Sequence, residues 1–125
     1  MSLKNLKDKL WEECKRIIRK RYVDRNGNWR CFTCDQLITE PRNAQTGHFI
    51  ASSICGAYLR YDLRNLRIQC YKCNINAGGN GAEYYRRMVI ENGQEFVDQI
   101  FQDKQKLIKA DEIWYKNKIE EYKKL

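Results

Sequence analysis

Two Cys-x-x-Cys pairs constrain this chain more than any other feature of its sequence. The first pair is Cys31 and Cys34, the second is Cys70 and Cys73, and 35 residues separate them. Two residues between paired cysteines let both sulfur atoms face one ion, and Zn²⁺ takes four thiolates in a tetrahedron. We therefore predict a structural zinc site that ties two distant segments together.

The chain contains six cysteines, which could instead form three disulfide bonds. The N-terminal residues lack the apolar core of an export signal, and Cys-x-x-Cys pairs are typical of metal binding in reduced proteins, so zinc is the favoured interpretation. Cys14 and Cys55 lie outside the pairs and are predicted to be structural. The same reasoning predicts a cytoplasmic protein, and no apolar run is long enough to span a membrane.

The formal net charge of +8 is concentrated near the N-terminus. Residues 1–30 carry ten Lys or Arg and four Asp or Glu, whereas residues 81–125 carry nine of each. A basic segment beside a zinc module predicts a polyanionic partner, and nucleic acid is the simplest candidate. A basic helix that only keeps the chain soluble is the alternative.

Hydrophobic periodicity predicts an α+β fold. Apolar residues at three- and four-residue steps predict a helix over 3–22, and short apolar runs predict strands over 29–32, 48–50 and 66–69. A glycine-rich turn over 74–81 precedes helices predicted over 82–91, 94–109 and 110–124. We expect a single domain in which a basic helix and turn (1–28) and C-terminal helices (93–125) pack on a zinc core (29–92).

The chain's only histidine, His48, lies between the two cysteine pairs, and Asn65 and Asn74 follow it. Asn74 comes directly after the last predicted zinc ligand. If the three side chains converge, they could hydrolyse a phosphodiester: imidazole takes a proton from water, a hard cation polarises the phosphate, and an amide fixes the imidazole or the hairpin backbone.

Each of these residues also has a simpler interpretation. His48 could be a zinc ligand, although four cysteines already fill a tetrahedron, or it could be a core or DNA-contacting residue. Asn65 could end a loop by bonding its own backbone, and Asn74 could cap the helix or turn after the second cysteine pair.

The order Cys-x2-Cys, His, Asn-Leu-x3-Cys-x2-Cys-Asn resembles the HNH, or ββα-metal, endonuclease motif built on a treble-clef zinc centre. The resemblance implies that His48 is the general base, that Asn65 orients it, and that Asn74 binds a catalytic Mg²⁺ or Mn²⁺. Many HNH enzymes carry Asp directly before the first His, where this chain has Gly47. Further cation ligands would then come from Asp62, Asn76 or Asn80.

A longer set of residues is similar to the NinG/Rap family of phage recombination endonucleases. It comprises Gly47-His48-Phe49, Leu59-Arg60-Tyr61-Asp62, Asn65 with Gln69 to Asn74, Gly79-Asn80 with Tyr84, and Gly93-Gln94-Glu95 with Val97. This resemblance covers residues 31 to about 100. It implies a divalent-metal-dependent nuclease that acts on branched recombination intermediates in the cytoplasm of the host cell.

Six basic residues are predicted to contact DNA phosphates: Arg16, Arg19, Arg60, Arg64, Arg67 and Lys72. The competing function is a non-catalytic, zinc-stabilised DNA-binding protein. A protein–protein adaptor would explain the zinc site and helices but not the histidine and the two asparagines. Substrate structure, preferred cation and oligomeric state stay open, with a dimer as one option.

Overall fold

The computed structural model describes residues 1–125 and has the predicted α+β composition. No helix combines the length and apolar character that crossing a bilayer requires. The helices are α1 (Leu3–Tyr22), α2 (Ala57–Arg60), α3 (Gly81–Asn92), α4 (Gln94–Asp103) and α5 (Glu112–Lys123), and the strands are β1 (Trp29–Arg30), β2 (Leu37–Ile38), β3 (Gln45–His48) and β4 (Leu66–Gln69).

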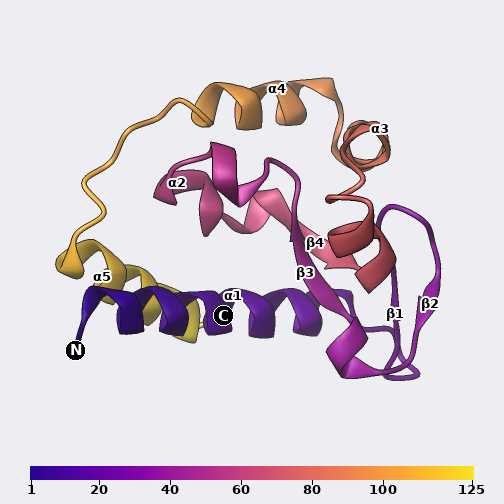
Figure 1. Cartoon of the computed structure of the whole chain (residues 1–125), viewed down its shortest axis with the longest axis horizontal. Coiled ribbons are helices and arrows are strands. Elements are labelled where there is room, and N and C mark those ends of the chain that lie inside the picture. The colour runs from indigo at the N-terminus through magenta and orange to yellow at the C-terminus, as the bar shows by residue number, and fades with distance from the viewer.

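Helix α1 has the predicted boundaries. It begins where the Ser2 hydroxyl accepts a hydrogen bond from the Asn5 backbone N–H at 3.1 Å, which caps the first turn. The predicted apolar stripe is buried against α5 and against one face of the β3–β4 hairpin, except at its two ends, where Leu3 and Tyr22 are exposed. Figure 1 shows α1 and α5 lying together along one side of the molecule. The buried residues of the stripe are Leu6, Leu10, Cys14, Ile17 and Ile18.

Strands β3 and β4 form an antiparallel hairpin in which Gln45 pairs with Gln69 and His48 pairs with Leu66. The predicted strand over 48–50 lies too far along the chain, because β3 begins at Gln45 and ends at His48. The ladder ends there because the Asn65 side chain, rather than a strand backbone, takes the N–H of Ile50 at 2.7 Å. Strand β4 has the predicted boundaries.

Two groups of buried side chains lie on opposite sides of this hairpin. Leu66 and Ile68 of β4 pack with α1 and α5, together with three of the paired cysteines. Phe49 and Ile50, just after β3, pack instead with residues of α2, α3 and α4. Figure 1 shows α4 on the side of the molecule opposite α1 and α5, with α2 and the hairpin between them. The hairpin that carries His48 is therefore held from both sides.

The C-terminal prediction was partly wrong. Helix α4 ends at Asp103, and residues 104–111 connect it to α5 without continuing the helix. This segment crosses from one side of the molecule to the other, so a continuous helix would carry the chain away from α1 (Figure 1). Leu107, which lies in this segment, is consequently 94% exposed. Helix α5 restarts where the Asp111 carboxylate accepts the Trp114 N–H at 3.0 Å.

Candidate functional site

The two cysteine pairs meet in space. The sulfur atoms of Cys31, Cys34, Cys70 and Cys73 all lie within 4.8 Å of one another, and the Cys34 and Cys70 sulfur atoms are 3.8 Å apart. Thiolates bound to one Zn²⁺ at about 2.3 Å in a tetrahedron would be about 3.8 Å apart. All six cysteines are free thiols, so the disulfide alternative is not realised. The cluster has the ligand type, number and spacing of a structural zinc site.

Hydrogen bonds at Cys31 favour its thiolate, the form that binds metal, whereas burial raises the pKa of Cys34 to about 12 and also raises that of Cys70. Burial opposes ionisation of Cys31, but bonds from the Thr33 hydroxyl and from backbone N–H groups outweigh it and lower the pKa of Cys31 to about 7. The Asn80 side-chain amide lies 3.6 Å from the Cys73 sulfur. Cys14 lies outside the cluster, and burial raises its pKa to about 12, so it is a neutral thiol in the core, as predicted.

His48 is held by two contacts on the other side of the hairpin from α3. Its Nε2 atom lies 2.9 Å from the backbone carbonyl oxygen of Arg60. Its ring stacks on Trp11 of α1, with ring centroids 5.0 Å apart and planes inclined by 10°. Because a carbonyl oxygen can only accept, Nε2 carries the proton and Nδ1 is left as an acceptor. His48 is not among the residues that meet in the cysteine cluster, so the zinc-ligand interpretation is not supported.

Burial lowers the pKa of His48 below its usual value, and the nearby positive charge of Arg60 acts in the same direction. The hydrogen bond to the Arg60 carbonyl opposes this effect without reversing it. Since an unperturbed histidine has a pKa of about 6.5, His48 is a neutral imidazole at neutral pH. The site thus contains an oriented, uncharged base.

Asn65 is fully buried and contacts backbone rather than the imidazole. Its amide nitrogen donates to the carbonyl oxygens of Ile50 at 3.0 Å and Leu59 at 3.3 Å, and its oxygen accepts the Ile50 N–H. Leu59 immediately precedes Arg60, whose carbonyl accepts from His48. Asn65 therefore joins the end of β3 to α2, next to the carbonyl group that holds His48. The alternative, in which Asn65 ends a loop by bonding its own backbone, does not account for these bonds to Ile50 and Leu59.

Asn74 lies in a π-helical turn over Lys72–Asn76 that follows the second cysteine pair. Its amide nitrogen donates to the Gln45 side-chain oxygen at 2.9 Å, which brings it against β3. Among the other predicted cation ligands, Asp62 is already paired with Arg64, Asn80 reaches Cys73, and Asn76 is exposed. Among the predicted cation ligands, Asn74 is therefore the one whose side chain bonds the β3–β4 hairpin.

Most of the predicted phosphate-binding residues make contacts inside the protein. Arg16 donates to the Tyr122 carbonyl at 2.9 Å, Arg19 to the Ala44 carbonyl at 3.2 Å, and Arg60 to the Ser52 carbonyl at 3.0 Å. These bonds hold α5 and two loops in place. Each guanidinium has further N–H groups, so phosphate contact by these residues stays a prediction.

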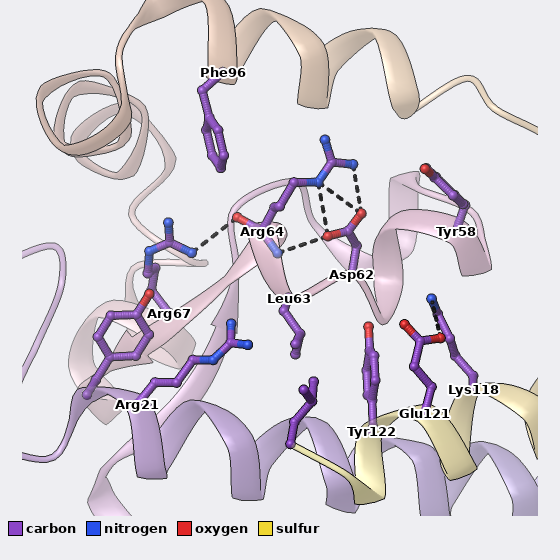
Figure 2. A pocket seen from close by; sticks show the side chains of 12 residues that line it. Arg21, Tyr58, Asp62, Leu63, Arg64, Arg67, Phe96, Lys118, Glu121 and Tyr122 are labelled. Carbon is purple, nitrogen blue, oxygen red and sulfur yellow. Dashed lines mark hydrogen bonds and ion pairs between the residues drawn. The ribbon is translucent and has the colours of Figure 1, made fainter.

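Arg64 and Arg67 lie beside a surface pocket of about 440 Å³ between α1, α4 and α5. Figure 2 shows the Arg64 guanidinium bonded to the carboxylate of Asp62 and Arg67 directed at the Arg64 carbonyl. Arg64 also pairs with Asp103, and Arg67, whose side chain is 5% exposed, pairs with Glu91 at 2.8 Å. Their charges are balanced within the protein, whereas Lys72 is exposed and forms no ion pair.

A second cleft, of about 280 Å³, borders His48 and was not foreseen from the sequence. The glycine-rich turn and the side chains of Tyr85, Phe101 and Lys104 line it. Lys104 follows α4 and forms no ion pair, so its ammonium group is available to an anionic ligand in this cleft. No sequence signal separates Lys104 from the other lysines near it, because its place depends on where α4 ends.

Comparison with known proteins identifies the family of this chain. The family model described as Bacteriophage Lambda NinG protein matches residues 2–125. The chain belongs to the NinG family. The resemblance to NinG is thereby confirmed.

Individual NinG proteins match a shorter stretch. Protein ninG of Escherichia phage 933W is 32% identical over 77 residues, which cover 62% of this chain and 37% of that protein. Protein ninG of Escherichia phage lambda is 31% identical over 77 residues, covering 62% and 36%. The match thus spans little more than a third of these relatives. No solved structure matches the chain significantly.

The cysteine cluster predicts which cysteines are needed for metal. Replacing Cys70→Ser should remove one of four ligands, lower the bound zinc per chain and lower the melting temperature, because metal binding is coupled to folding of such centres. Metal content is measured by elemental analysis and unfolding by circular dichroism. Cys55→Ser is the matched control, since Cys55 is buried outside the cluster and its variant should keep one zinc per chain. Full zinc retention by Cys70→Ser would refute the ligand assignment.

Proposed function

We propose that this NinG protein is a divalent-metal-dependent DNA endonuclease of the HNH type, acting on branched recombination intermediates, with a structural zinc ion on its four cysteines. The proposal combines the HNH-like order of residues with the geometry of His48. An oriented neutral imidazole at the end of a hairpin strand, whose partner strand β4 leads into the four-cysteine cluster, is the observation that carries it.

His48 supplies the base chemistry in this proposal. The Arg60 carbonyl accepts the Nε2 proton, so the Nδ1 lone pair is free to take a proton from an attacking water molecule. Stacking on Trp11 restricts rotation of the ring. Asn65 maintains the backbone on both sides of this arrangement without contacting the reacting atoms.

Asn74 is the proposed side-chain ligand of the catalytic cation. It belongs to the turn fixed by Cys70 and Cys73, and its bond to Gln45 draws it against β3. A bound Mg²⁺ or Mn²⁺ would polarise the phosphate and stabilise the leaving oxygen. The cysteine cluster acts in this scheme by holding Asn74 in place relative to the hairpin.

A non-catalytic, zinc-stabilised DNA-binding protein is the competing function. One observation favours it: residue 47, where many HNH enzymes carry Asp, is glycine and contributes no carboxylate. Both functions require DNA as the partner, and they differ in whether His48 is needed for anything besides structure.

His48→Ala separates these two functions. Loss of a general base commonly lowers a rate by about 10²–10⁴-fold, so cleavage of a labelled four-way or flapped DNA in Mg²⁺ or Mn²⁺ should fall by that order. Zinc content and DNA affinity should stay near those of the wild type, because His48 is outside the cysteine cluster. Metal-dependent nicking by a carefully purified His48→Ala protein at the wild-type rate would exclude the mechanism, and tight binding without cleavage by the wild type would favour the competing function.

The lowered pKa of His48 predicts the pH dependence of cleavage. The imidazole is a base only when deprotonated, and its pKa lies below about 6.5, so the rate should be level around neutral pH and should fall only in more acidic solution. Initial rates of nicking at constant ionic strength, measured from about pH 5 to about pH 8, test this. A midpoint of the acidic limb above about 6.5 would show that the environment assigned to His48 is wrong.

Lys104 tests whether the cleft beside His48 contacts DNA. Lys104→Ala should weaken binding to all DNA sequences and reduce the slope of log affinity against log salt by about one, because one phosphate contact is lost. Fluorescence anisotropy over a range of salt concentrations measures both effects. Lys116→Ala is the charge-matched control, since Lys116 lies on α5 and is paired with Glu112. Equal effects of the two substitutions would place the DNA elsewhere.

A further inference from the structure

Gln69, at the end of β4, has a buried side-chain oxygen without a partner. The side chain is fully buried, and its amide nitrogen donates to the Thr33 hydroxyl at 3.1 Å and to the Gly79 carbonyl at 2.9 Å. Its oxygen, Oε1, accepts no hydrogen bond. Buried polar atoms nearly always have a partner, so an orphaned carbonyl oxygen beside a functional site needs an explanation.

The orientation of this amide follows from its neighbours. The Gly79 carbonyl can only accept a hydrogen bond, so the end of the amide that faces it must be the NH₂ group. Turning the amide over would place two oxygen atoms against each other and would leave the NH₂ group without acceptors. The atom directed at β3 is therefore the oxygen.

The orphaned oxygen occupies the place of a side chain at residue 47. A Cβ atom built on Gly47 would lie 1.8 Å from Gln69 Oε1. Gly47 is not among the residues with positive φ, so its backbone does not require glycine. Glycine is required instead by the Gln69 amide, which reaches across the hairpin into the position directly before His48.

The same face of the hairpin carries the other proposed cation ligand. Gln69 is the cross-strand partner of Gln45, and Gln45 accepts the hydrogen bond from Asn74. The residue opposite Gln69 in the hairpin is thus the one that Asn74 bonds, which brings Asn74 to the same end of the hairpin as Gln69. Amide oxygens are suitable ligands for hard divalent cations, although they bind more weakly than carboxylates.

We propose that Gln69 Oε1 is the side-chain oxygen that this chain supplies to the divalent cation in place of a carboxylate at residue 47. The inference rests on the proposed nuclease function. Gln69 is the last residue of β4 and directly precedes Cys70, so the zinc centre would hold this ligand as well as Asn74. The ligand oxygen that many HNH enzymes place at residue 47 on β3 would then come from Gln69 on the neighbouring strand β4.

The test measures binding of Mn²⁺ to the DNA-free, zinc-loaded protein. Mn²⁺ should broaden the side-chain amide signals of Gln69 in an NMR spectrum, and Gln69→Leu should weaken Mn²⁺ binding, followed by electron paramagnetic resonance, by on the order of tenfold. Thr46→Val is the matched control, because Thr46 also has a buried unpartnered oxygen but lies on the opposite face of β3. It should leave Mn²⁺ binding unchanged.

Two further variants keep the inference testable if Gln69→Leu fails to fold. Gln69→Glu replaces the neutral ligand by a carboxylate, so it should bind Mn²⁺ more tightly than the wild type and should gain melting temperature when Mn²⁺ is added. Gly47→Asp should destabilise the protein by colliding with the amide, whereas Gly47→Asp combined with Gln69→Ala should fold and recover Mn²⁺ binding.

The inference is overturned if folded Gln69→Leu binds Mn²⁺ as the wild type does, if millimolar Mn²⁺ leaves the Gln69 signals sharp, or if Gln69→Glu gains neither affinity nor stability from Mn²⁺. The first result would mean that a water molecule satisfies Oε1. These outcomes are separate from failure of the nuclease proposal, which is decided by cleavage with His48→Ala and by Mn²⁺ binding to Asn74→Ala. If Asn74→Ala abolishes Mn²⁺ binding and Gln69→Leu does not, the nuclease proposal stands and the assignment of Gln69 as a ligand is wrong.

Discussion

The four-cysteine cluster is the constraint on which the centre of this protein depends. Strands β1 and β2 pair over only two residues, and β3 and β4 over four, which is too little sheet to be stable alone. The cluster joins the turn between β1 and β2 to the turn after β4, and three of its cysteines are buried with α1 and α5. The positions of Asn74 and Gln69 both follow from this junction, because one directly follows Cys73 and the other directly precedes Cys70.

The site beside the cluster is built largely from backbone carbonyl groups. Arg60 contributes its carbonyl to His48, and Ile50 and Leu59 contribute theirs to Asn65. Such contacts depend on the path of the chain rather than on the identity of the residues that supply them. The arrangement gives a half-buried imidazole a fixed tautomer and a lowered pKa without any acidic neighbour. It is consistent with a base that must be uncharged at neutral pH.

The basic residues serve two purposes that sequence alone does not separate. Arg16 and Arg19 belong to the basic N-terminal segment, yet both bond backbone carbonyls that hold other elements against α1. Arg67 is enclosed between Tyr22, Phe32 and Glu91. The excess positive charge on the surface therefore comes chiefly from lysines and from arginines outside these contacts. DNA binding, as proposed, would use the N–H groups that these arginines leave free together with unpaired lysines such as Lys72 and Lys104.

The sequence by itself determined the features that depend on local spacing. The Cys-x-x-Cys pairs predict the metal cluster, the apolar steps in 3–22 predict α1, and the run Leu66–Gln69 predicts β4, because each signal repeats within a few residues. Only the tertiary structure decided that His48 bonds the Arg60 carbonyl, that Gln69 fills the space at Gly47, and that the chain leaves α4 at Asp103 to reach α5. These features arise from contacts between segments far apart in sequence, whose geometry exists only when both sides of the hairpin are packed.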